Sequence, residues 1–289
     1  MLQVARLAPK LLGESTGLVA DFLRSQEEAA GGFVDREGKN DLYYTVFGIE
    51  GLLALREPLP ADLIQSYLRS FGDGEELDLV HLTCLIRCWA GLPPALRHDL
   101  SINKLLGRVA SFHTPDGGYA LSPQAPLGSI YGCFMVVGAY QDLAQPIPNG
   151  HRLLDFVGGL RDPEGGYFNG RDIPVSLVPS TAAAVCLLRH LGADRIDPSV
   201  GRWLLSCFHP QGGFRSHPET LLPDLLSTAT ALHALSSLKV ELGPWKEPCL
   251  DFIDTLWNSR GGFCGNWEDS HLDCEYTYYA LLALGHLSL

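Results

Sequence analysis

The sequence contains no run of about 18 apolar residues without a charged or polar break, which is the minimum for a helix that spans a bilayer. It also lacks a cluster of basic residues: 21 Lys and Arg stand against 33 Asp and Glu, for a formal net charge of −12. These two absences argue against a membrane span and against a nucleic-acid partner. The first residues, MLQVARLAPKLLGE, lack the apolar stretch and small-residue cleavage site of a secretory signal, so we expect a cytoplasmic protein.

Several common motifs are absent as well. Eight Cys occur in the 289 residues, but none forms a C-x-x-C pair, which predicts reduced, buried thiols and no disulfide framework. The patterns G-x-x-x-x-G-K-[ST], G-x-S-x-G and H-E-x-x-H do not occur. Their absence argues against P-loop nucleotide hydrolysis, α/β-hydrolase chemistry and zincin proteolysis.

What the sequence does contain is a repeat built on a Gly-Gly-aromatic triplet. The triplets begin at residues 31, 117, 165, 212 and 261, and the last four follow one another at intervals of 48, 47 and 49 residues. An amphipathic segment with apolar residues at helical spacing precedes each triplet, as in residues 102–112 and 249–257. A second, more apolar segment follows each one after a polar loop. The doublet glycines are predicted to occupy turns with φ > 0.

The second segments share a pattern in their first turn, and a sixth, degenerate unit completes the set. That unit consists of Gly72-Asp73-Gly74 followed by Asp78 and His81. Apolar residues recur at i, i+3, i+4 and i+7 in the second segments, so these are helices that are apolar nearly all round and must be buried. Six helical hairpins are therefore predicted, with no strong strand signal.

Six hairpins that cannot bury their inner helices alone either stack as an open solenoid or close into a ring. No polar capping repeat appears at either end, which favours closure. We therefore predict one all-α domain over residues 1–289, an α/α toroid of the α6/α6 barrel type.

The repeats resemble those of the prenyltransferase and squalene-cyclase superfamily, which read F-L-x-x-Q, Gly-Gly-aromatic, loop, Asp and then a helix. Here Phe22-Leu23-Arg24-Ser25-Gln26 precedes the first triplet, and Asp273 opens the last helix. The chain looks most like a protein prenyltransferase β subunit. This resemblance implies an isoprenoid funnel, a helical-repeat α subunit as partner, and zinc as a possible cofactor.

The resemblance does not carry over to the zinc and diphosphate positions. Asp224 matches a zinc-binding Asp, but Leu226 and Tyr276 stand where the family has its zinc-binding Cys and His. One carboxylate does not hold zinc tightly, so no metal is expected. His217, Thr220 and Pro126 replace the Arg, Lys and His of the diphosphate site. The weak alternative zinc ligands are Asp224, His271, Asp273 and Cys274.

Asp273 is the leading candidate for a catalytic acid. Asp273-Cys274 is similar to the Asp-Cys pair that supplies the protonating acid of oxidosqualene cyclases, and Asp224 is a second candidate. A carbocation formed by such an acid needs aromatic faces around it. Both Asp residues also stand where inner helices begin, so helix capping is the competing interpretation. The candidate ligand-binding residues are Tyr44, His81, Trp89, Tyr131, His217 and Tyr276.

Three functions stay open at this stage. The first is a divergent prenyltransferase β-subunit-like protein that binds an isoprenoid or another apolar small molecule in a central cavity, with thiol prenyl transfer not supported by the replaced residues. The second is a catalytically silent scaffold that binds a lipid or a partner. The third is a protonation-initiated terpene cyclase that uses Asp273. Whether the chain is an enzyme is left open.

Overall fold

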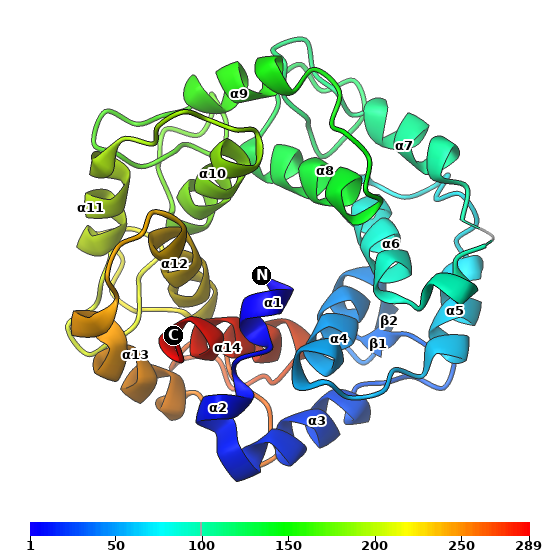
Figure 1. Cartoon of the computed structure of the whole chain (residues 1–289), viewed down its shortest axis with the longest axis horizontal. Helices are drawn as coiled ribbons and strands as arrows, with labels where there is room; N and C mark the ends of the chain where they lie inside the picture. The colour runs from blue at the N-terminus through cyan, green and yellow to red at the C-terminus, as the bar shows by residue number, and fades with distance from the viewer. Residues whose placement is uncertain (99) are drawn as a thin grey trace.

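The computed structural model describes residues 1–98 and 100–289. In that part of the chain twelve helices form two concentric rings, as Figure 1 shows. The outer ring consists of α3 (Thr16–Ser25), α5 (Ala61–Arg69), α7 (Ile102–Ala110), α9 (Gly150–Gly158), α11 (Pro198–Ser206) and α13 (Gly243–Thr255). The inner ring consists of α4 (Leu42–Leu55), α6 (Leu79–Gly91), α8 (Ile130–Asp142), α10 (Val178–His190), α12 (Leu225–Ser237) and α14 (Cys274–Leu287).

The remaining elements of the described residues are short. They are α1 (Leu2–Ala5), α2 (Pro9–Leu12), the 3-10 helices η1 (Gly13–Ser15) and η2 (Pro94–Leu96), and the strands β1 (Phe33–Val34) and β2 (Asn40–Asp41). The two strands pair antiparallel in the loop of the first hairpin. The predicted six-hairpin α/α toroid is therefore confirmed, including the degenerate unit, which forms α5 and α6. All eight Cys are free thiols, and six of them are buried.

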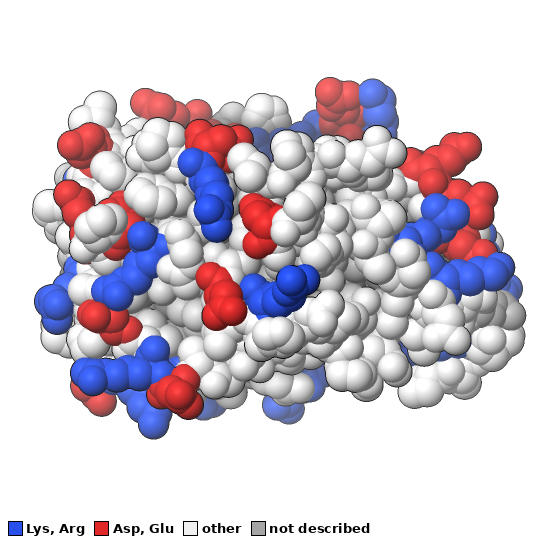
Figure 2. All heavy atoms as spheres, turned by 90° about the horizontal axis from the view of Figure 1, so that it is seen from above, with Lys and Arg blue, Asp and Glu red and all other residues white. Residues whose placement is uncertain are grey.

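The inner ring closes on itself. Each inner helix packs against the inner helix before it and the one after it, and α14 packs against α4 to complete the circle. The inner helices bury apolar residues on several faces, because the outer ring covers one side and the neighbours cover two others. Figure 2 shows the edge of the ring, where acidic and basic side chains are interspersed on this face.

A repeated hydrogen bond ties each loop to its inner helix. In the last hairpin but one, the Phe214 backbone N–H donates to Thr228 Oγ1 at 2.9 Å, and the Thr228 hydroxyl donates to the Asp224 carbonyl at 2.7 Å. The same bond from the aromatic N–H joins Phe33 to Thr45, Tyr167 to Thr181 and Phe263 to Thr277. The Thr in the repeat pattern therefore satisfies a buried backbone donor.

The glycine doublets pack each loop onto the following outer helix. The first glycine of every doublet has a positive φ, as predicted, and a Cβ on Gly261 would lie 2.0 Å from the Leu18 carbonyl oxygen. The second glycine of that doublet, Gly262, lies over the Phe22 ring, again without room for a Cβ. Leu18 and Phe22 belong to α3, so the last loop packs on the first outer helix and closes the outer ring.

The amino-terminal helix α1 reaches toward the centre of the ring in Figure 1 and contacts α14 near its carboxyl end, whereas the glycine-doublet loops lead into the amino-terminal ends of the inner helices. It packs against α14 and α4, and a Cβ on Gly285 would lie 2.1 Å from the Val4 carbonyl oxygen. Residue Met1 consequently reaches the centre of the ring. No helix in the described ranges is long and apolar enough to cross a bilayer.

Candidate ligand cavity

A cavity of about 440 Å³ lies inside the inner ring. This volume falls within the range of roughly 300 to 1,000 Å³ that is typical of small-molecule sites. Most of its wall is apolar or aromatic, and all six inner helices contribute to it. The aromatic lining residues are Tyr43, Phe47, Tyr131, Phe134, Tyr278 and Tyr279, and the small or aliphatic ones include Ala182, Ala183, Ile173 and Leu226.

The loop end of the cavity carries one set of polar side chains. Tyr43, Tyr131 and Glu275 each occupy the second position of an inner helix, so the three helices present them at the same level. The Tyr43 hydroxyl donates to Glu275 Oε1 at 2.5 Å. Asn169, in the loop before α10, also lines the cavity and accepts a hydrogen bond from the Tyr131 backbone N–H at 3.0 Å.

Glu275 is a carboxyl group with no basic partner within ion-pair distance among the described residues. Burial raises its pKa to about 7, although the hydrogen bond from Tyr43 and the Arg36 charge act in the opposite direction. Its place in the first turn of α14 favours the anion by about 0.3–1 kcal/mol. Desolvation of an unpaired carboxylate costs several kcal/mol and outweighs this effect, so a large fraction of Glu275 is protonated at neutral pH.

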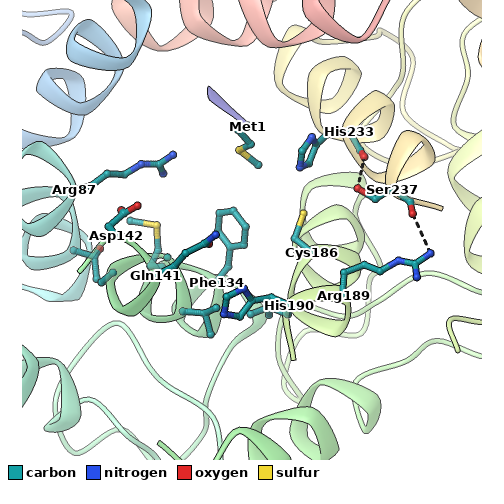
Figure 3. A pocket seen from close by; sticks show the side chains of 16 residues that line it. Met1, Arg87, Phe134, Gln141, Asp142, Cys186, Arg189, His190, His233 and Ser237 are labelled. Carbon is teal, nitrogen blue, oxygen red and sulfur yellow. Dashed lines mark hydrogen bonds between the residues drawn. The ribbon is translucent and has the colours of Figure 1, made fainter. Parts of the chain in front are cut away.

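The other end of the cavity carries a buried ion pair. Arg87 Nε donates to Glu50 Oε1 at 2.5 Å, and Glu50 is only 8% exposed. A second cavity of about 420 Å³ begins here and shares Met1, Arg87 and His233 with the first. Figure 3 shows Arg87, Met1, Asp142 and His233 around this second space. Its wall is more polar, and burial raises the pKa of Asp142 to about 6.

Two histidines meet beside this junction. His233 Nδ1 and His286 Nε2 are 2.9 Å apart, so one ring nitrogen donates to the other. Burial lowers the pKa of His233 to about 3 and that of His286 to about 4, which leaves both rings neutral at pH 7. Among the described residues, His286 Nδ1 has no hydrogen-bond partner.

The structure places both predicted acids at helix N-termini. Asp273 caps α14 through the Tyr276 backbone N–H at 2.8 Å, and its other oxygen accepts from Arg36 Nε at 2.7 Å. Asp224 caps α12 through the backbone N–H of Ser227 at 2.7 Å and accepts from the Ser227 hydroxyl. Burial raises the pKa of both carboxyls. Neither residue lines the central cavity, and the geometry supports the capping interpretation.

Among the predicted ligand-binding residues, Tyr131 lines the cavity, whereas the other five lie outside its lining. Trp89 is 3% exposed and belongs to the hydrophobic core. Tyr44 lies at the start of α4, and Tyr276 packs under Arg36, with the guanidinium carbon 5.2 Å from the ring centroid.

The two predicted histidines also lie away from the cavity lining. His81 lies between Asp41 and Asp78, at 3.4 Å and 2.8 Å. The hydrogen bond to Asp41 and then that to Asp78 raise the pKa of His81 to about 9. His217 lies in the loop before α12, where its ring stacks edge-on against Trp203.

The residues at the family's zinc positions do not fit a zinc ion. Leu226 lines the cavity with an aliphatic side chain, and Tyr276 packs under Arg36. Zinc needs three or four convergent N, S or O ligands, and Asp224 alone remains. Among the weaker candidates, Cys274 is buried and His271 bonds Asp269 at 3.2 Å. Over the described part of the chain, no three His, Cys, Asp or Glu side chains converge as a metal site.

Sequence patterns did not single out Glu275 and Arg87, which line the cavity, or Glu50, which pairs with Arg87. A signal for the latter two was present, because each is a charged residue inside an otherwise apolar inner helix. Tyr43, Phe134 and Tyr279, aromatic residues of the inner helices, also line the cavity. Glu275 had no signal of its own, since an acidic residue in a first helical turn is ordinary.

The sequence profile of the prenyltransferase alpha-alpha toroid domain matches residues 15–86 and 194–288, more than half of the chain. The chain belongs to this family. Protein farnesyltransferase subunit beta of Arabidopsis thaliana is 32% identical over 138 residues, which are 45% of this chain and 28% of that subunit. The Pisum sativum subunit is 29% identical over 159 residues, 53% of this chain and 37% of that subunit. The chain thus spans about a third of the length of the curated relatives it matches.

Solved structures share the toroid. Protein geranylgeranyltransferase-I of Candida albicans, complexed with GGPP, superposes with a TM-score of 0.67 and 17% identity, over 83% of this chain and 82% of that chain. An Asp-to-Asn variant of the type II terpene cyclase MstE from Scytonema, in complex with geranylgeranyl dihydroxybenzoate, gives a TM-score of 0.62 and 14% identity over 97% of both chains. At these identities the likeness establishes the fold alone.

Proposed function

We propose that this toroid binds an isoprenoid or a similar apolar chain in its central cavity. The observation that carries the proposal is the cavity of about 440 Å³, walled by aromatic and aliphatic side chains from all six inner helices. An apolar chain gains about 25 cal/mol for each Å² that it removes from water in such a space. The relatives described above with GGPP and with geranylgeranyl dihydroxybenzoate hold isoprenoid compounds in the same fold, which supports this ligand class.

Thiol prenyl transfer through zinc receives no support from the residues present. Leu226 and Tyr276 supply no metal ligand, and His217 and Thr220 bond each other in their loop at 2.8 Å instead of forming a cationic phosphate site. Acid catalysis by Asp273 is likewise not favoured, because Arg36 holds that carboxylate outside the cavity lining. Ligand binding is therefore the function that the geometry supports best.

The test is binding of geranylgeraniol, measured by the thermal midpoint and by isothermal titration at pH 6. A ligand that binds the native state raises the midpoint with concentration. Ala183 lines the cavity, so Ala183→Trp should fill part of the space and weaken binding at least tenfold. Ala110→Trp, on the exposed surface of α7, is the matched control and should bind like the wild type. Equal binding by both variants would contradict the central cavity as the site.

A further inference from the structure

Glu275 and Tyr43 form a hydrogen-bonded pair of a carboxyl group and a phenol at the loop end of the cavity. Glu275 and Tyr43 are the polar side chains that meet there, 2.5 Å apart, and both line the cavity. Tyr43 has Phe47 one turn below it on α4, and Glu275 has Tyr278 and Tyr279 one turn below it on α14. The pair therefore places a carboxyl group and a phenol hydroxyl at the loop end of the cavity, above aromatic side chains of α4 and α14.

The cation that acts on Glu275, Arg36, already forms ion pairs with other carboxylates. Arg36 donates to Asp269 at 2.9 Å and to Asp273 at 2.7 Å, so it acts on Glu275 only through space. Arg87 is the sole Lys or Arg among the described residues that line the cavity, and it lies at the other end with Glu50. A diphosphate needs Lys or Arg donors to replace its water, and none of the described residues that line the Glu275 end is a Lys or Arg.

We propose that the ligand's headgroup is uncharged, a hydroxyl or carbonyl group that hydrogen-bonds the Glu275–Tyr43 pair, and that a diphosphate is excluded from this position. The inference rests on the proposed function, since it names the class of isoprenoid bound. When Glu275 is neutral, its carbonyl oxygen accepts from Tyr43 and its acid O–H remains to donate to the headgroup oxygen. When Glu275 is ionised, that donor is lost, and a diphosphate beside the carboxylate adds like-charge repulsion.

Among the groups at the loop end of the cavity, Glu275 is the one that titrates near neutrality. Burial raises the pKa of Glu275 to about 7. The ionisable groups that interact with it, besides Tyr43, are the Arg36–Asp273 pair and the phenols Tyr44, Tyr131, Tyr276 and Tyr279. Asp224 at the cap of α12 acts on Tyr276, and Cys84 of α6 acts on Tyr131. Burial raises the pKa of Cys84 and of each of these phenols, so they stay neutral between pH 6 and pH 8.

The experiment compares geranylgeraniol and geranylgeranyl diphosphate by isothermal titration across pH 6 to 8. Because the alcohol hydroxyl can itself donate to the ionised carboxylate, its affinity should change less than tenfold between pH 6 and pH 8, whereas the diphosphate should bind more weakly at pH 8 than at pH 6. Glu275→Gln keeps the shape and a neutral donor, so its affinity for the alcohol should not change with pH. The same variant should bind the diphosphate more tightly than the wild type does at pH 8.

Two further variants separate the proposal from a general loss of structure. Tyr43→Phe removes only the phenol hydroxyl and should weaken alcohol binding about fivefold to tenfold. Glu268→Gln, an exposed loop residue outside the cavity lining, should retain the wild-type pH profile. A wild-type protein that prefers the diphosphate to the alcohol, or that binds the diphosphate equally at pH 6 and pH 8, overturns this inference. No binding of the alcohol even at pH 6 overturns the proposed function itself.

Discussion

At the scale of single residues, the inner-helix threonines do more than fill space. Thr228 is completely buried, and its hydroxyl both accepts from the Phe214 N–H and donates to the Asp224 carbonyl. It therefore links a loop, a helix cap and the helix itself. Three other hairpins repeat the bond between the aromatic N–H and Thr, so the Thr of the repeat is a structural residue and not part of a ligand site.

Replacement of Thr228 by Val tests this role. Val keeps the shape but leaves the buried Phe214 N–H without an acceptor, which should lower the free energy of unfolding by about 1–3 kcal/mol. Thr228→Ser is the matched control: it keeps the hydroxyl and loses one methyl group, for a cost of about 1 kcal/mol. Urea denaturation of both variants decides the question, and an equal loss in the two would show that the hydrogen bond contributes little.

At the scale of elements, the glycine doublets are the joints between hairpins. The first glycine of each doublet has φ between +94° and +116°, a region that side chains rarely adopt. How much room surrounds it differs from joint to joint. A Cβ on Gly261 would overlap the α3 backbone, whereas a Cβ on Gly117 would lie an ordinary 3.5 Å from the Arg152 carbonyl oxygen.

This difference predicts unequal effects of the same substitution. Gly117→Ala should cost about 1–2 kcal/mol of stability, from the left-handed backbone alone. Gly261→Ala carries the same strain and must in addition push the last loop away from α3, so its cost should clearly exceed that of Gly117→Ala. Urea denaturation gives the two costs, and hydrogen exchange should show faster opening of α3 in Gly261→Ala only. Equal losses in the free energy of unfolding would show that the last loop moves away from α3 at no measurable cost.

At the scale of the whole molecule, closure changes how the hairpins depend on one another. In an open solenoid each repeat contacts only its neighbours, and stability is close to a sum over repeats. Here α14 packs on α4 and Gly261 packs on α3, so each inner helix has another inner helix on both sides. A central cavity with a continuous wall exists only because the circle is complete.

We expect the closed ring to unfold as a unit. The five Trp residues lie in the second, fifth and sixth hairpins, so their fluorescence reports on these three hairpins, whereas circular dichroism reports on all helices. The urea transitions seen by the two signals should coincide in the wild type. In Gly261→Ala, where the contact between the last loop and α3 is disturbed, the fluorescence and circular dichroism transitions should separate. Separate transitions in the wild type would contradict cooperative closure.

The sequence by itself determined the hairpins, because helical periodicity, capping Asp residues and glycine doublets are local signals that tertiary contacts reinforce. It also predicted the ring, through helices too apolar to face water. The members of the cavity wall were decided by the tertiary structure. On helices that are apolar all round, periodicity does not distinguish the face toward the lumen from the face toward the outer ring, so Tyr131 lines the cavity while Trp89 lies in the core. The pKa of Glu275 likewise depends on tertiary contacts. Burial raises it, and a hydrogen bond from Tyr43, which lies 232 residues away in the chain and 2.5 Å away in space, lowers it.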